Sequence, residues 1–173
     1  MYKTGFTILA FILLSCKDSS VNNQTQNNDK IFFETEYINS AWGFSYHGIM
    51  VDQGGDIYSY NPAKDNISLL YHTDGTYTEQ ELQSKYQHAK TYLRRVAEDS
   101  LKWSHDLAAK VAINDFSDTT RVGADMGSLE YSVYIYRPLI AKYQKIIFKA
   151  EGDFTFFNKS ESAIALVTWL KKL

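Results

Sequence analysis

The chain contains a single cysteine, Cys16, which closes the apolar run that begins near the N-terminus at Gly5. No internal disulfide can therefore form, and the fold must be held together by a hydrophobic core. A length of 173 residues with 45% hydrophobic content is sufficient for one domain with a sizeable core. Because Pro is scarce, at 2 residues, we expect most of this domain to be ordered.

The N-terminal apolar run has the features of an export signal. Lys3 precedes the run, which extends to Leu14. It is shorter than the roughly 20 residues of a membrane-spanning helix and has the length of a signal-peptide core. The run ends in Leu13-Leu14-Ser15-Cys16, which resembles the lipobox of bacterial lipoproteins. The resemblance implies that residues 1–15 are a signal peptide, and that Cys16 carries a diacylglyceryl group and an acylated amine. The alternative is an N-terminal hydrophobic helix with an incidental buried cysteine.

The segment that follows Cys16 is polar. Residues 17–29 contain one apolar residue, Val21, so they cannot bury enough surface to order themselves. We expect residues 16–29 to be the lipidated cysteine and a flexible tether, with the membrane contacted through the lipid on Cys16. Lys17 stands where the inner-membrane retention signal of enterobacterial lipoproteins has Asp, which favours the outer membrane. The Lys17-Asp18 pair also partly resembles the surface-export signal of Bacteroidota lipoproteins.

The remainder, residues 30–173, is expected to be a single globular α+β domain. Residues 31–60 alternate as strands do, with Trp42, Phe44 and Tyr46 on one face. Apolar runs on both sides of the turn at residues 52–56, Asp-Gln-Gly-Gly-Asp, predict a β-hairpin. Further strands are expected at residues 131–136 and 144–149, and a second hairpin turn at 151–153.

One long helix is predicted over residues 78–113, with a kink near Ser100. Thr78 and Glu81 form a capping box at its start. Its apolar residues recur at sevens, and we expect this stripe to lie against an antiparallel sheet of hairpins. The stripe consists of Leu82, Tyr86, Ala89, Leu93, Val96, Trp103 and Leu107.

A C-terminal helix completes the predicted fold. Asn158 is expected to cap it, with Glu161 in its first turn. Its predicted buried stripe consists of Ala163, Ile164, Val167 and Leu170. A partial repeat at 97 positions relates residues 49–61 to residues 146–158, which leaves two interpretations open: a resemblance shared by all Gly-Asp hairpins, or an old duplication.

Motifs for catalysis and metal binding are absent from the sequence. The four histidines, His47, His72, His88 and His105, have no zinc spacing. Residues 52–56 resemble a calcium loop only superficially, because the distal Glu and the correctly placed Gly are missing. No nucleophile elbow or phosphate-binding loop occurs. We therefore expect no cofactor, no metal and no catalytic residue.

Charge excludes one class of partner, and aromatic content indicates another. The net charge is −2, and no basic run follows the signal peptide, so nucleic acid is not expected as a partner. Aromatic residues are abundant, with 13 Tyr, 10 Phe and 3 Trp. Stacking on a sugar or a peptide is the predicted use of this surplus. The candidate binding residues are Trp42, Phe44, Tyr134 and Tyr136.

Three functional hypotheses follow. The preferred one is a non-enzymatic envelope lipoprotein that binds a protein or glycan. The second is a hydrolase or transferase acting on an envelope polymer. The third is an inhibitory lipoprotein, such as an immunity factor.

Overall fold

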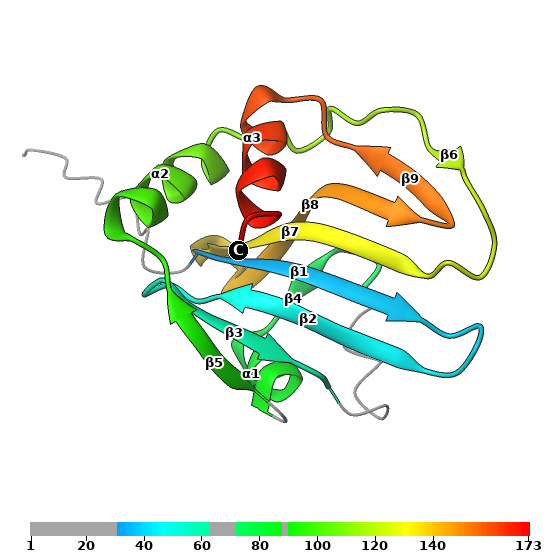
Figure 1. Cartoon of the computed structure of the whole chain (residues 1–173). Helices are drawn as coiled ribbons and strands as arrows, with labels where there is room; N and C mark the ends of the chain where they lie inside the picture. The colour runs from blue at the N-terminus through cyan, green and yellow to red at the C-terminus, as the bar shows by residue number, and fades with distance from the viewer. Residues whose placement is uncertain (1–30, 63–71, 88–89) are drawn as a thin grey trace, which may run out of the picture.

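The structure, a computed structural model, describes residues 31–62, 72–87 and 90–173, which form one antiparallel sheet with three α-helices (Figure 1). The strands are β1 Ile31–Asn39, β2 Ser45–Val51, β3 Asp56–Tyr60, β4 Thr76–Tyr77, β5 Thr91–Arg95, β6 Thr120–Arg121, β7 Ser128–Arg137, β8 Lys142–Gly152 and β9 Phe154–Phe157. The helices are α1 Glu79–Gln87, α2 Glu98–Ala108 and α3 Glu161–Leu170, and a 3₁₀ helix, Pro138–Ile140, joins β7 to β8.

The sheet is built from two meanders that meet at its centre. Its strand order is β5-β3-β2-β1-β7-β8-β9-β6, and β4 pairs with β8. β1-β2-β3 and β7-β8-β9 are each antiparallel meanders, joined by the β1–β7 pairing. The 97-residue repeat is not maintained in the register, because β2 and β3 pair Val51 with Ile57 whereas β8 and β9 pair Ala150 with Phe156. The duplication therefore stays a prediction.

The two faces of the sheet are covered by different helices. Strand side chains alternate between faces, so neighbouring residues of β1 enter different cores. Phe33 belongs to a core shared with α2 and α3, and Phe32 belongs to a core shared with α1. Figure 1 shows α2 and α3 on one side of the sheet and α1 on the other. The second core is predominantly aromatic, and it positions the candidate site.

The single long helix predicted over residues 78–113 is wrong. The chain forms α1, then strand β5, then α2, and His88 and Ala89 lie outside the described residues. Residues 91–95 pair with β3, a partner about 35 positions earlier, and this non-local pairing overrides the helical spacing. Leu93, expected in the buried stripe, is 47% exposed.

The sequence predicted the two hairpin turns and the start of α1 correctly. Asp52 Oδ1 accepts hydrogen bonds from the backbone N–H of Gly54 and of Asp56, and it thereby holds the turn between β2 and β3. At α1, the N–H of Glu81 donates to Thr78 Oγ1 over 3.2 Å, and the N–H of Thr78 donates back to Glu81 over 2.7 Å. This reciprocal pair is the capping box.

The C-terminal helix exists, but its cap and its buried face differ from the prediction. Ser160 is the N-cap and accepts from the N–H of Ala163, whereas Asn158 bonds Ser160 and the carbonyl oxygen of Ala112. Ala163 and Leu170 are buried as predicted, but Leu166 and Trp169 complete the buried face and Ile164 is 51% exposed. The N-cap therefore lies two residues after the predicted one.

Candidate functional site

Two glutamates are buried in the aromatic core under α1. Glu34 and Glu36 lie two residues apart on β1, so their side chains share one face of the sheet. They are 0% and 2% exposed. Buried carboxylates are strongly destabilising unless they are paired and hydrogen-bonded. The stability of this core therefore depends on the groups that contact the two glutamates.

Lysine side chains neutralise these glutamates from two directions. Lys85 of α1 places its Nζ 2.9 Å from Glu34 Oε2 and 2.7 Å from Glu36 Oε2. Lys145 of β8 donates to Glu36 and, over 2.8 Å, to Glu130 of β7. We refer to these five residues as the charge network. Its formal charge is −1, from three carboxylates and two ammonium groups.

Tyrosines surround the charge network. Four rings place their centroids 5.4–5.9 Å from Lys85 Nζ, which is within cation–π range. Hydroxyl groups of the same rings donate to the carboxylates, three to Glu34 and one to Glu36. The rings belong to Tyr46, Tyr60, Tyr86 and Tyr134.

One glycine allows this arrangement. Tyr60 lies on β3, and its hydroxyl reaches Glu34 on β1 by crossing over β2 at Gly48. A Cβ atom at Gly48 would collide with the Tyr60 ring and with the carbonyl oxygen of Thr35. The absent side chain is therefore the space that the tyrosine occupies.

The charge network shifts the ionisation of its members. Burial raises the pKa of Glu36, but the ammonium groups of Lys145 and Lys85 outweigh burial and hold it well below its ordinary value. Burial lowers the pKa of Lys145, but the carboxylates of Glu36 and Glu130 raise it well above its ordinary value. Burial and the nearby Glu34 raise the pKa of Tyr134 well above its ordinary value. The tyrosines therefore act as neutral donors, and the paired groups Glu36 and Lys145 stay charged.

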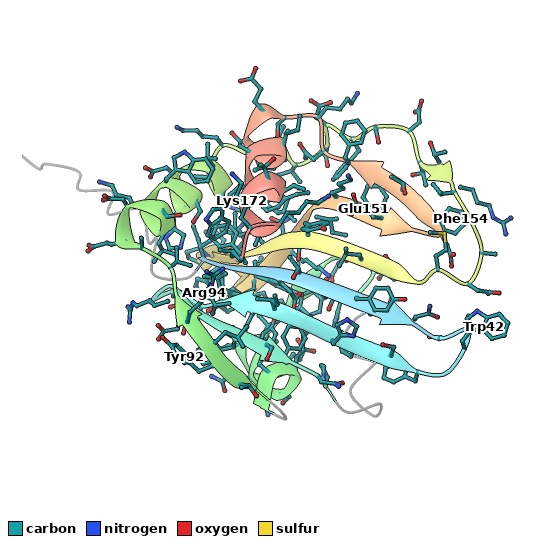
Figure 2. The ribbon with its side chains drawn as sticks, in the orientation of Figure 1. Trp42, Tyr92, Arg94, Glu151, Phe154 and Lys172 are labelled. Carbon is teal, nitrogen blue, oxygen red and sulfur yellow. The ribbon has the colours of Figure 1, made fainter. Side chains whose placement is uncertain are left out.

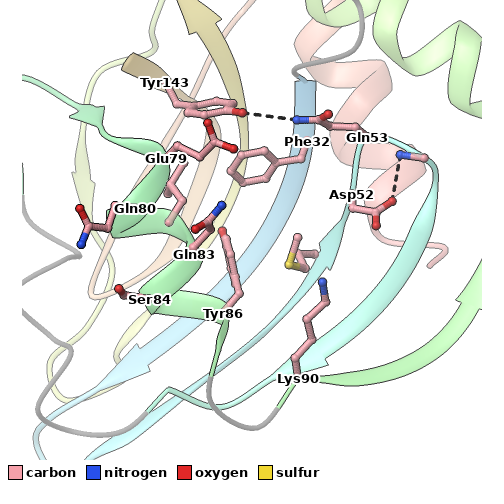
Figure 3. Close-up of a pocket in the computed structure, with 13 residues that line it drawn as sticks. Phe32, Asp52, Gln53, Glu79, Gln80, Gln83, Ser84, Tyr86, Lys90 and Tyr143 are labelled. Carbon is pink, nitrogen blue, oxygen red and sulfur yellow. Dashed lines mark hydrogen bonds between the residues drawn. The ribbon is translucent and has the colours of Figure 1, made fainter. Parts of the chain in front are cut away.

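A pocket of about 790 Å³ adjoins the charge network (Figure 3). We refer to it as the α1 pocket. Its walls are α1, the start of β1, the turn between β2 and β3, and the start of β8. It is lined by Phe32, Met50, Asp52, Gln53, Gly54, Glu79, Gln80, Leu82, Gln83, Ser84, Tyr86, Lys90 and Tyr143.

Tyr86 separates the α1 pocket from the charge network. Its ring lines the pocket, and its hydroxyl donates to Glu34 over 2.8 Å. Phe32 lies beside it, with the ring edge-to-face at 5.9 Å. Because both side chains are less than 10% exposed, they close the floor of the pocket.

The polar side chains of the α1 pocket are three amides, two carboxylates, one serine and the ammonium group of Lys90. Gln53, Gln80 and Gln83 line it, and Gln53 Nε2 donates to the hydroxyl of Tyr143 over 3.4 Å. Figure 3 shows its two carboxylates, Asp52 and Glu79, on opposite sides of Phe32. An aromatic floor with an amide rim can stack on a ligand and hydrogen-bond it.

The binding residues suggested by the sequence do not form one surface. Trp42 is 85% exposed beyond the end of β1, and Phe44 is half-buried near Tyr46. Tyr136 is half-buried against the aromatic core, whereas Tyr134 is fully buried beside Glu34. Cys16 lies outside the described residues. The abundance of aromatic residues indicated an aromatic binding site, but strand alternation did not identify Phe32, Tyr86 and Tyr143 as the residues that line it.

The histidines do not form a metal centre in the described part of the chain. His72 Nε2 is 3.4 Å from Glu81, and His47 lies 3.4 Å from Ser45 Oγ. His105 is buried under Phe33, with the ring centroids 5.8 Å apart. No group of three His, Cys, Asp or Glu residues among residues 31–62, 72–87 and 90–173 could hold a metal ion.

Comparisons with known protein families, curated proteins and solved structures give no match to this chain. Among the residues that the structure describes, no helix is both long and apolar enough to cross a membrane.

Proposed function

We propose that the chain is a lipid-anchored lipoprotein of the bacterial cell envelope whose domain binds a glycan without catalysing a reaction. The observation that carries this proposal is the α1 pocket, with an aromatic floor and an amide rim. The anchor is inferred from the lipobox at Leu13–Cys16 and favours the outer membrane. A protein ligand for the same pocket is the outcome that competes with a glycan.

The lining of the α1 pocket matches the chemistry of a sugar. Apolar ring faces stack on the C–H face of a pyranose, and amides both donate to and accept from hydroxyl groups. The pocket offers Phe32, Tyr86 and Tyr143 for stacking and Gln53, Gln80 and Gln83 for hydrogen bonds. Its volume of about 790 Å³ lies within the range of small-ligand sites.

The placement of the acids supports binding over catalysis. Asp52 is engaged by the backbone of its own turn, and Glu79 comes from the opposite wall. The carboxylates of Glu34 and Glu36 lie beneath Tyr86, where a ligand in the pocket does not reach them. Most glycoside hydrolases use one carboxyl group as a proton donor and a second as a base or nucleophile. In the α1 pocket, Asp52 already accepts two hydrogen bonds from its own turn, so it is not free to take either role.

Ligand binding is tested with the soluble chain that begins after Cys16. Soluble oligosaccharide and peptide fragments of the envelope are titrated by calorimetry. Gln53→Ala and Gln83→Ala should each weaken binding of the glycan, because both exposed amides line the pocket. Asn114→Ala, an exposed amide elsewhere, is the matched control. Binding of peptide only, or equal affinity for all variants, would contradict the proposal.

The anchor is tested separately in cells. Cys16→Ala should abolish acyl labelling and leave the precursor uncleaved, because the acylated thiol is the substrate for cleavage before Cys16 in lipoproteins. The readout is metabolic labelling with an acyl probe, together with the mass of the protein. Equal labelling of the wild type and the variant would exclude lipidation at Cys16.

A further inference from the structure

The turn between β7 and β8 presents two aliphatic side chains to solvent. Leu139 is 101% exposed and Ile140 is 53% exposed. The turn is well defined, because Arg137 pairs with Lys142 directly beneath it. Pro138 begins its 3₁₀ helix, and the N–H of Ala141 donates back to the carbonyl oxygen of Pro138 over 3.3 Å. We refer to Leu139 and Ile140 as the apolar tip.

The apolar tip lies at the end of the sheet where the chain enters the domain. β1 begins at Ile31, which pairs with Ile135 of β7, four residues before Leu139. At about 3.3 Å per residue, the tip is on the order of 15 Å from Ile31. Figure 1 shows the start of β1 and the connection from β7 to β8 at the same end of the sheet.

The tether length is compatible with contact between this end and the membrane. Fourteen residues, 17–30, separate Cys16 from Ile31, and they span at most ~50 Å when extended. An anchored domain has a high effective concentration at the membrane, so a small apolar contact can orient it. Arg137 and Lys142 flank the tip, where they donate to the uncharged side chains of Gln144 and Thr76. Their positive charge suits an anionic surface.

The opposite end of the sheet also exposes apolar side chains, so either end of the sheet could face the membrane. Trp42, 85% exposed, and Phe154, 56% exposed, lie there (Figure 2). β1 alone, nine residues long, separates the two ends by on the order of 30 Å. One membrane surface cannot contact both ends at once. The end that carries the apolar tip is favoured because the chain from Cys16 enters the sheet there, at Ile31.

We propose that Leu139 and Ile140 insert into the surface of the membrane that holds the lipid on Cys16, so that the sheet stands end-on with Trp42 directed away. This inference rests on the proposed lipid anchor. The α1 pocket is lined by Phe32, Gln53 and Tyr143, which belong to the same end of the sheet. Docking through the tip therefore places the pocket close to the lipid headgroups.

The test uses the lipidated protein in vesicles of phosphatidylethanolamine and phosphatidylglycerol. Acylation consumes the thiol of Cys16, so an introduced cysteine can be labelled selectively with an environment-sensitive fluorophore. Leu139→Cys is compared with Ser40→Cys, an exposed position at the opposite end. The label at position 139 should shift to shorter wavelength and be quenched by brominated lipid, and the label at 40 should do neither. Adding Ile140→Ser to Leu139→Cys should reduce the quenching.

The possible failures are distinguishable. The mass of the N-terminal fragment is measured first, and a chain without acyl groups contradicts the anchor itself. An acylated chain with no quenching at position 139 overturns the docking proposal and leaves the anchor intact. Stronger quenching at position 40 than at 139 reverses the orientation and also overturns it.

Discussion

Replacing Lys85 by Met is the sharpest perturbation of the charge network. The substitution retains the length of the side chain and removes one buried ammonium group, which is 2% exposed. Glu36 keeps its partner Lys145, but Glu34 is left with tyrosine hydroxyls alone. Removing one partner of a buried ion pair typically costs about 3–5 kcal/mol. We expect a loss of this size in the free energy of unfolding at pH 7.

The assay is urea unfolding of the soluble chain, followed by circular dichroism. Lys102→Met, an exposed lysine on α2, is the matched control and should change stability by less than about 0.5 kcal/mol. Adding Glu34→Gln to Lys85→Met should recover part of the loss, because the uncompensated charge is then gone. If Lys85→Met destabilises the protein no more than Lys102→Met does, the ion pairs do not hold α1 on the sheet.

Other predictions concern packing and pH. Leu166→Ala should lower the free energy of unfolding by about 2–5 kcal/mol because Leu166 is fully buried; in the same urea assay, Leu93→Ala should behave as a surface change, and equal losses would contradict the assigned faces. Gly48→Ala should cost about 1–3 kcal/mol by overpacking against the Tyr60 ring and the carbonyl oxygen of Thr35, and a neutral result would contradict the close packing at this position. The lowered pKa of Glu36 gives stability that is complete above its ordinary value of 4.5 and is lost as the pH falls. The raised pKa of Lys145 gives stability that is complete below its ordinary value of 10.5 and is lost as the pH rises further. Urea midpoints measured from pH 3 to pH 11 should therefore form a plateau between these limits. A midpoint that rises below pH 4.5 would contradict the shift of Glu36, and one that rises above pH 10.5 would contradict the shift of Lys145.

Local signals in the sequence predicted local structure well. The turn at Asp52 and the capping box at Thr78 depend on contacts within four residues, so the chain specifies them directly. The long helix failed because β5 exists only through its pairing with β3. An apolar residue every seven positions, such as Leu82 and Val96, is compatible with two separate helices and a strand between them.

The charge network could not be predicted in the same way. Glu34 and Glu36 occupy alternate positions of a strand, where acids ordinarily mark a solvated face. Their burial depends on Lys85 and Lys145, which lie about 50 and 110 positions away. Tertiary pairing of this kind leaves no spacing pattern, and the abundance of tyrosine was its only trace in composition.

The hydrogen bonds around Glu34 couple residues separated by up to 100 positions, since Tyr134 donates to it across the central strand pair. A substitution at one member leaves the others with an unsatisfied buried group. We therefore expect selection to disfavour single changes in this set and to favour compensated ones. Across evolution the set should behave as one inherited block. Distant relatives should keep two acids spaced by one residue in the first strand, a glycine facing the second acid, and an adjacent Lys-Tyr pair on the covering helix. This set of residues would identify homologues after the rest of the sequence has diverged.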